Sequence, residues 1–302
     1  MIVSASYRTD VPAFYGEWFL NRLDAGYCMA VNPYGGPAYR VGLQRDQVDG
    51  FVFWTKNLGP FLDKLEIVRQ RGYPFVVQYS INGYPRSLEL SVGEPARSVA
   101  IAQQVANRYG PRAVVWRYDP IVVTSSTSVA FHRRNFKNLA AALAGTTDEV
   151  VISFAHLYRK TRRNLDRAAA AFDFSWDDPS DEAKRDLVAE FADVAAGHQM
   201  QLSVCSQRQY LVPGVAAARC VDAVRLSDVA GHHIVAPTRG NRPDCACAAS
   251  RDVGAYDTCP HGCVYCYAVS NRSVARQRQQ RHDPSGAFLY EPAVGGPASR
   301  TP

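Results

Sequence analysis

The sequence predicts an α/β protein built as a (β/α) barrel, or a partial barrel, with parallel strands. Short apolar runs rich in β-branched and aromatic residues alternate with longer amphipathic stretches along most of the chain. This alternation is typical of βαβ units and a parallel sheet. No G-x-G-x-x-G motif follows the first apolar run, so the fingerprint of a dinucleotide-binding fold is missing. With right-handed crossovers, this many units favour a closed or partial barrel over an open doubly wound sheet.

The expected strands are near-continuous apolar runs, which suit strands buried on both faces. In chain order they cover residues 2–6, 51–57, 75–81, 113–121, 150–155 and 201–206, with a weaker candidate at 222–227. The clearest helical patterns cover residues 58–72, 94–110 and 180–198. A glycine stands at or near the end of each pattern, as is usual where a helix stops.

The composition changes near Asp228, where Gly, Pro, Arg and Cys become frequent. We therefore expect residues 1–227 to form the barrel-like domain. Residues 228–275 would form a Cys-rich, loop-rich, cluster-binding segment packed on the barrel. Residues 276–302 would form a basic stretch followed by a poorly ordered tail.

Length, hydropathy and charge restrict the class of protein. The chain has 302 residues, 47% of them hydrophobic, which is enough for a large core. No apolar run approaches the roughly 18–20 residues that span a bilayer, and the first residues do not resemble a signal peptide. We therefore expect a soluble cytoplasmic protein without a membrane partner. The net charge of +6 is modest and lies partly in the run 276–282, so a nucleic-acid partner is not expected.

Polar side chains follow each expected strand. In a (β/α) barrel the carboxyl ends of the strands converge on the active-site face. Such convergence predicts a pocket for a small polar or anionic ligand. The side chains that we expect to orient it are Arg8, Asp10, Lys56, Arg117 and Asp119. The basic stretch "YRKTRRN" (158–164) could clamp phosphate or carboxylate groups, or could be an exposed helix start.

The cysteines are concentrated near the end of the sequence. Five of the eight lie between Cys245 and Cys266, a pattern that favours metal binding over disulfides in a chain of this size. Cys259, Cys263 and Cys266 have the spacing Cys-x3-Cys-x2-Cys. Three thiolates can hold three irons of a [4Fe–4S] cluster and leave the fourth iron open, whereas clusters that only carry electrons normally use four cysteines.

The loop "CPHGCVYCYA" (259–268) resembles the radical S-adenosylmethionine (SAM) superfamily, and especially its spore photoproduct lyase-type branch. The resemblance implies that the three cysteines ligate the cluster and that its open iron binds SAM. Reductive cleavage of SAM then gives a 5′-deoxyadenosyl radical. It also implies that Tyr265 and Tyr267 pack around the cluster. Gly262 would allow the loop to fold closely, and His261 is expected to form hydrogen bonds within the loop.

The whole chain resembles a bacterial family of unknown function with this C-terminal arrangement. The matching stretches are "SASYRTDVPAFYGEWF", "FWTKN", "WRYDPI", "YRKTRRN" and "GAYDTCPHGCVYCYA". In the radical SAM superfamily the cysteine triplet normally follows the first barrel strand, whereas here it follows the last. We therefore expect the loop to fold back over the strand ends. The resemblance implies a small polar or nucleotide-like substrate and a reductase or flavodoxin-type electron donor. The chain has no Gly-Gly-Glu segment of the kind that often holds the SAM amino group.

Four further cysteines would suffice for a second cluster or a zinc ion. Cys245 and Cys247, which form a Cys-x-Cys pair beside the loop, are the safer candidate ligands. Cys220 is less certain, and Cys205 could be an ordinary buried strand cysteine. Cys28 is interpreted as packing.

Two other hypotheses remain open from the sequence. The protein could be a barrel with a structural zinc or a fully ligated iron–sulfur site and no radical chemistry. The zinc would then be held by Cys245 or Cys247 together with the triplet. A nucleic-acid repair module is the weakest hypothesis, and steeply salt-dependent DNA affinity would be required of it.

Overall fold

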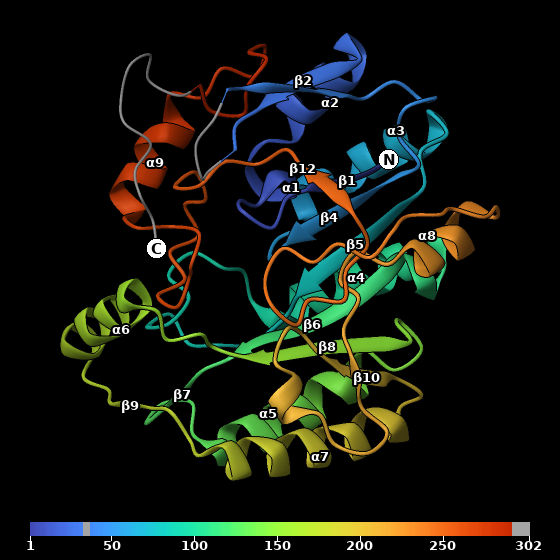
Figure 1. The fold of residues 1–302 in the computed structure, drawn as a ribbon. Coiled ribbons are helices and arrows are strands. Elements are labelled where there is room, and N and C mark those ends of the chain that lie inside the picture. Colours follow the sequence, from blue (N-terminus) through green and yellow to red (C-terminus); the bar gives the residue numbers. More distant parts are fainter. Residues whose placement is uncertain (33–36, 292–302) are drawn as a thin grey trace.

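The protein is a mixed α/β fold around a large parallel sheet, shown by a computed structural model that describes residues 1–32 and 37–291. The sheet has eight strands in the order β11-β10-β8-β6-β5-β4-β1-β12 (Figure 1). Every neighbouring pair in it is parallel. The parallel α/β class predicted from the sequence is therefore confirmed. The recorded strand pairing ends at β11 and β12, so closure into a barrel stays a prediction.

Six of the strands agree with the apolar runs of the sequence to within a few residues. The strands of the sheet are β1 (Ile2–Ala5), β4 (Gly50–Thr55), β5 (Phe75–Ser80), β6 (Val114–Ile121), β8 (Glu149–Phe154), β10 (Gln201–Val204), β11 (Ala216–Ala217) and β12 (Ser250–Asp252). Two small antiparallel pairs complete the strands: β2 (Tyr27–Ala30) with β3 (Tyr39–Gly42), and β7 (Val123–Thr124) with β9 (Trp176–Asp177).

The helices follow the strands as expected for βαβ units. They are α1 (Val11–Phe14), α2 (Gly16–Ala25), α3 (Leu62–Gln70), α4 (Pro95–Tyr109), α5 (Val129–Ala142), α6 (Arg159–Phe172), α7 (Asp181–Gly197), α8 (Ala223–Ala230) and α9 (Arg272–Gln280). None of the helices in the described part of the chain is both long and apolar enough to cross a membrane.

The weak strand candidate at 222–227 is wrong, because this stretch forms the start of helix α8. The side chain of Asp222 accepts a hydrogen bond from the backbone N–H of Val224, which caps the helix. Gly231 then ends the helix in the left-handed conformation. These capping residues decide the structure where the short apolar alternation is ambiguous.

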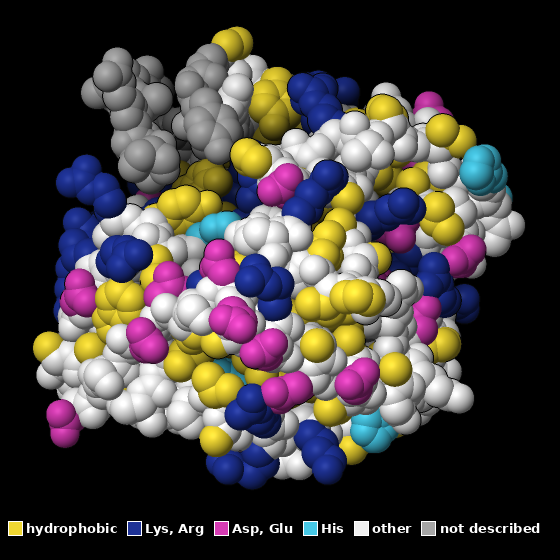
Figure 2. Space-filling view, turned by 60° about the horizontal axis from the view of Figure 1, so that its bottom comes forward, with side chains coloured by type: hydrophobic (Ala, Val, Ile, Leu, Met, Phe, Trp, Pro, Cys, Tyr) yellow, Lys and Arg dark blue, Asp and Glu magenta, His cyan; other side chains and the backbone are white. Residues whose placement is uncertain are grey.

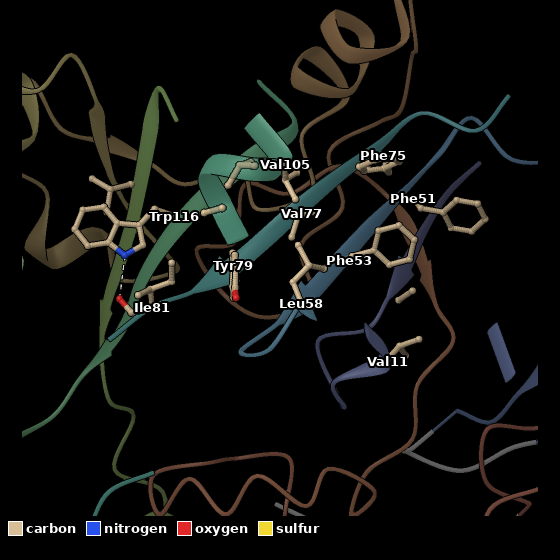
Figure 3. Close-up of a cluster of buried hydrophobic side chains, with 14 of the residues drawn as sticks. Val11, Phe51, Phe53, Leu58, Phe75, Val77, Tyr79, Ile81, Val105 and Trp116 are labelled. Atoms are coloured by element: carbon tan, nitrogen blue, oxygen red, sulfur yellow. Dashed lines mark hydrogen bonds between the residues drawn. The ribbon is translucent and has the colours of Figure 1, made fainter. Parts of the chain in front are cut away.

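The sheet separates two apolar clusters, because successive side chains of a strand point to opposite faces. Phe53, Val77 and Trp116 belong to the main core, which includes the inner faces of α3, α4, α5 and α7 (Figure 3). The neighbouring residues Val52 and Val76 belong to the second cluster. That cluster is completed by residues between 205 and 248, which include Leu226 of α8. Helices α3, α4, α5 and α7 thus pack on one face, and the later part of the chain covers the other (Figure 1).

The C-terminal part is more ordered than the sequence suggested. β12 lies inside the segment expected to be loop-rich, and it pairs with β1. Residues 283–291 do not form the expected poorly ordered tail. The indole N–H of Trp18 in α2 donates to the carbonyl of Gly286 at 3.0 Å, and Leu289 is buried. The remaining tail residues, 292–302, lie outside the described part of the chain.

Basic and acidic side chains are interspersed on the face presented in Figure 2, with apolar side chains between them. Neither sign dominates that face. The described side chains on this face form no continuous basic stripe of the kind that binds phosphate backbones.

Candidate active site at the cysteine loop

The loop 259–268 lies across the carboxyl ends of the first strands of the sheet. The hydroxyl of Tyr267 donates to the carbonyl of Tyr7, just after β1, at 2.6 Å. Cys263 forms an antiparallel bridge with Glu89 in the loop that follows β5. A late segment thus occupies the position that a loop after the first strand would take.

The three thiols of this loop, which we call the thiol triplet, are close enough for their charges to interact. Burial raises the pKa of Cys259, and negative charge on Asp10, Cys266 and Cys263 raises it further. Burial likewise raises the pKa values of the other two thiols. Free thiols held in these surroundings stay protonated at neutral pH.

A glycine allows the loop to turn between the first two cysteines. Gly262 has φ of +77°, in the region that favours glycine. A Cβ placed there would lie 2.5 Å from Nε of Arg272 and 3.2 Å from Cβ of Leu90. The close folding expected at Gly262 therefore has both a conformational and a steric reason.

Asp10 ties the end of β1 to the cysteine loop. Its Oδ1 accepts from the N–H of Ala13 at 2.9 Å and caps helix α1. Its Oδ2 accepts from the N–H of Lys56 at 2.8 Å and lies 2.8 Å from Nε2 of His261. Both carboxylate oxygens are therefore engaged within the protein, and the side chain that we expected to orient a ligand holds the strand ends in place.

His261 forms a hydrogen bond within the loop through its backbone, to Cys259, whereas its side chain bonds outside the loop. Besides its contact with Asp10, its Nδ1 lies 3.3 Å from the carbonyl of Ser91. The imidazole is buried and connects the cysteine loop to two other segments. The side-chain partners could not be predicted, because nothing in the local sequence shows that Asp10 and Ser91 lie beside the imidazole.

Lys56 reaches a buried carboxylate beside the triplet. Its Nζ lies 2.8 Å from Oε1 of Glu89, and the hydroxyl of Tyr265 donates to the same carboxylate. Burial is the largest influence on the pKa of Lys56 and lowers it, but the charge of Glu89, its hydrogen bond to Lys56 and the nearby Cys263 and Asp119 together outweigh burial, so the net pKa is raised. The amide of Asn82 completes the group, with Nδ2 at 3.3 Å from the Tyr265 hydroxyl.

Glu89 was missed in the sequence, where it stands in an ordinary polar stretch. The one available signal is the length of the connection between β5 and α4, which runs from residue 81 to 94. Long connections in compact domains are usually functional. A cavity of about 230 Å³ lies along this connection, and its polar lining includes Asn82, Arg86, Glu89 and Ser98.

Arg8 lies in an aromatic setting after β1. Its guanidinium is 5.3 Å from the ring centre of Tyr7 and 5.6 Å from that of Tyr256. Its Nε is 3.8 Å from Oδ1 of Asp252 at the end of β12. The two aromatic rings stabilise the positive charge of the Arg8 guanidinium. Asp252, like Glu89, is a buried carboxylate that the sequence analysis did not single out.

Arg117 and Asp119 form a buried ion pair at the end of β6. Nη2 of Arg117 lies 2.5 Å from Oδ2 of Asp119. Burial is the largest influence on the pKa of Asp119 and raises it, but the charge of Arg117, hydrogen bonds from Ser153 and Arg117, and the charge of Arg242 together hold the pKa below its ordinary value. Nη1 of Arg117 also donates to Oε1 of Gln78 and to Sγ of Cys220, both at 3.0 Å.

Four other cysteines meet in the second apolar cluster, and we call them the thiol quartet: Cys205, Cys220, Cys245 and Cys247. Sγ of Cys220 lies 3.5 Å from Sγ of Cys205. Side-chain hydrogen bonds connect Cys247 to Cys220 and to Cys245. The structure therefore joins the Cys-x-Cys pair to the two less certain cysteines. Cys28 lies separately in the main core, as the packing interpretation expected.

The cysteines predicted to bind metal, those of the triplet together with Cys245 and Cys247, lie in two groups, but their sulfur atoms do not surround a common point. As the side chains stand, the described part of the chain has no group of three or more His, Cys, Asp or Glu residues that could hold a metal ion. Coordination at the triplet or at the quartet therefore requires thiol side chains to reorient.

The basic stretch 158–164 forms the beginning of α6, which starts at Arg159. Arg162 and Arg163 are exposed. This arrangement agrees with the helix-start interpretation. Lys160 is the member that approaches the cysteine loop, where its charge partly offsets the burial that raises the pKa of Cys266.

Comparison with known protein families shows a match to one family model. The family model described as "Domain of unknown function (DUF1848)" matches residues 2–268, nearly the whole chain and the complete cysteine loop. No curated protein matches the sequence.

Proposed function

The chain belongs to the DUF1848 family of unknown function, and we propose that it is an iron–sulfur enzyme of radical SAM type. In this proposal Cys259, Cys263 and Cys266 hold a [4Fe–4S] cluster with one open iron. The observation that carries the proposal is the position of the loop 259–268, which lies on the ends of β1 and β4 next to Asp10 and Lys56. A cluster held there faces the strand ends, where (β/α) folds place their chemistry.

The residues present fit such a cluster in their donor chemistry. Three thiols of one loop lie close enough for their charges to interact, the other cysteines of the described chain lie in other clusters, and Gly262 gives the backbone the turn that a compact loop needs. Neighbouring carboxylates are already engaged: Asp10 with three donors, and Glu89 with Lys56 and Tyr265. These carboxylates are therefore poor candidates for a fourth ligand. When bound, the cluster would supply one electron to SAM, with a reductase or flavodoxin-type protein as the donor.

The side chains around the loop have separate tasks in this proposal. Asp10 and His261 fix the cysteine loop against the strand ends. Tyr265, Glu89 and Lys56 close one side of it. Glu89 also lines the cavity along residues 81–94, which would receive SAM or a small polar or nucleotide-like substrate. Tyr267 lies on the side of Tyr7, beside the stacked Arg8. The sheet would act as the wall of a partial barrel that shields this region from water.

Anaerobic reconstitution with iron and sulfide tests the proposal. We expect a brown protein with broad absorbance near ~400 nm, about four irons per chain at the triplet, and formation of 5′-deoxyadenosine from SAM with dithionite. Cys263→Ala should lose both the iron and the product, whereas Cys28→Ala, which removes a buried cysteine elsewhere, should keep them. A Cys263→Ala protein that still makes 5′-deoxyadenosine would remove the triplet from the mechanism. A colourless protein whose triplet holds zinc would favour a structural metal site instead.

A further inference from the structure

The thiol quartet lies outside the triplet loop and has its own surroundings. Cys205 ends β10, Cys220 follows β11, and Cys245 and Cys247 precede β12. Three of the four are buried, and Cys245 is partly exposed. Together they join three segments that are remote in sequence, on the sheet face opposite the large helices.

We propose that the quartet binds one zinc ion as a tetrathiolate, which fastens residues 205–247 to the sheet. This inference is independent of the chemistry at the triplet. Zinc held by four cysteines is typical of structural sites. The segment concerned has little regular structure between α8 and β12, so a metal crosslink has a clear structural task there.

The spacing of the sulfur atoms favours a single ion over a second cluster. Sulfurs at about 2.3 Å from one tetrahedral zinc lie roughly 3.8 Å apart. The 3.5 Å between the sulfurs of Cys205 and Cys220 is close to this value. In a [4Fe–4S] cluster each thiolate binds a different iron, which sets the sulfurs farther apart.

Hydrogen-bond donors around the sulfurs suit a complex with excess negative charge. Nη1 of Arg117 is 3.0 Å from Sγ of Cys220, and Nη2 of Arg242 is 3.4 Å from Sγ of Cys205. The backbone N–H of Val221 donates to Sγ of Cys247 at 3.4 Å. Four thiolates and Zn²⁺ carry two net negative charges, and two guanidinium groups lie beside them. Donors of this kind stabilise and orient the ligands of a metal.

Ordinary packing explains the quartet less well. A buried free cysteine behaves as a small apolar residue, as Cys28 does in the main core. In the quartet, by contrast, the sulfurs contact one another in the order Cys205, Cys220, Cys247, Cys245, and a cation or N–H faces three of them. The loop also fits closely around Cys245, because a Cβ on Gly240 would lie 2.5 Å from the Cys245 carbonyl oxygen.

Coordination requires a small rearrangement and a release of protons. The contacts form an open series, so the terminal sulfurs, those of Cys205 and Cys245, must turn toward the two central ones. Four thiols then bind Zn²⁺ through sulfur and release four protons to the solvent, which makes zinc affinity rise with pH.

The experiment uses the full chain with the triplet disabled by Cys259→Ser, Cys263→Ser and Cys266→Ser. We expect about one zinc per chain by elemental analysis of this variant, a result that does not depend on iron or SAM at the triplet. Adding Cys247→Ser should remove the zinc, whereas adding Cys28→Ala should leave it in place. A triplet-free chain that holds no zinc after incubation with ZnCl2, or that holds iron in the quartet, would overturn the inference.

Two measurements keep the test decisive if Cys247→Ser fails to fold. Titration of the triplet-free protein with p-hydroxymercuribenzoate should release its zinc as the quartet thiols react. Peptide mapping by mass spectrometry that finds a Cys205–Cys220 disulfide in this protein would contradict the site. Arg242 is exposed, so its replacement should not unfold the chain. Arg242→Gln removes the guanidinium beside Cys205 and should weaken zinc binding by about tenfold in a chelator competition. Arg239→Gln in the same loop is the matched control and should leave the affinity unchanged.

Discussion

Nζ of Lys56 lies 2.8 Å from Oε1 of Glu89, and this ion pair joins the end of β4 to the loop that follows β5. The two side chains have exposed fractions of only 14% and 4%. Tyr265 donates to the same carboxylate, so the pair also supports the cysteine loop. Removing one partner of a buried pair leaves the other charge without compensation.

Replacing Glu89 is therefore expected to be costly. Glu89→Ala should lower the free energy of unfolding by about 3 kcal/mol, because Lys56 stays buried without its partner. The double variant Lys56→Met/Glu89→Leu should recover much of this loss, since neither charge remains. Chemical denaturation measures both. The exposed pair Arg133–Glu190 is the control, and Glu190→Ala should cost much less. Equal losses for Glu89→Ala and Glu190→Ala would contradict the structural role of the buried pair.

We expect Asp10 to position the cysteine loop and the end of β1 by its hydrogen bonds. Asp10→Ala removes the cap of α1 and the acceptor for Lys56 N–H and His261, and should cost at least about 2 kcal/mol of unfolding free energy. It should also speed the reaction of the cysteine loop with a thiol reagent, because the loop loses its anchor. Asp46→Ala, at an exposed position, should change neither quantity. Unchanged thiol reactivity in Asp10→Ala would show that the loop is held by other contacts.

Gly262 should not tolerate a side chain. Gly262→Ala places a Cβ in a left-handed conformation and against Arg272, so the loop must shift. We expect lower thermal stability and, under the proposed function, less iron after reconstitution. Gly93→Ala offers a matched control, since a Cβ there meets nothing within 4 Å. If both variants take up iron equally, the turn at Gly262 has no part in forming the site.

His132 should make stability depend on pH. Burial lowers the pKa of His132 to about 4, and the ring lies between the Tyr118 hydroxyl and the Val122 carbonyl. The unfolded chain takes up this proton near pH 6.5, whereas the folded protein resists it. Stability should be full above about pH 6.5 and should fall by roughly 3 kcal/mol as the pH drops toward 4.

Denaturation curves between pH 4 and 7 measure this effect. His132→Gln should have lower stability at pH 7 but a weaker fall with acid. His233→Gln, at an exposed histidine, should keep the full dependence of the natural chain. An identical acid fall in His132→Gln would assign the dependence to other groups.

The sequence predicted the sheet well because its central strands are buried on both faces. Val76 and Val77 point to opposite apolar clusters, so their stretch is apolar throughout and easily recognised. The edge strand β12 (Ser250–Asp252) has no such signal, because its pairing with β1 depends on backbone hydrogen bonds rather than on apolar side chains. Helix α8 was missed because its capping residues, and not its apolar pattern, define it.

The sequence predicted several residues of the candidate site, but it did not predict which side chains contact one another there. Position at the ends of strands was enough to select Asp10 and Lys56. The same criterion does not select Glu89, because its role comes from a loop that folds back onto Lys56. Cys205 at the end of a strand has the sequence pattern of an ordinary buried cysteine, which does not show that Cys205 and Cys247 both reach Cys220 in space.

The pairing of β12 with β1 has a consequence for biosynthesis. β1 leaves the ribosome before the other strands of the sheet, but its outer edge stays uncovered until residues 250–252 have been translated. Both groups of cysteines are complete only at about the same stage, so a metal bound by all of their thiols can be inserted only after Cys247 or Cys266 has been translated. A nascent chain that terminates before residue 250 would expose the edge of its first strand, and exposed strand edges invite aggregation.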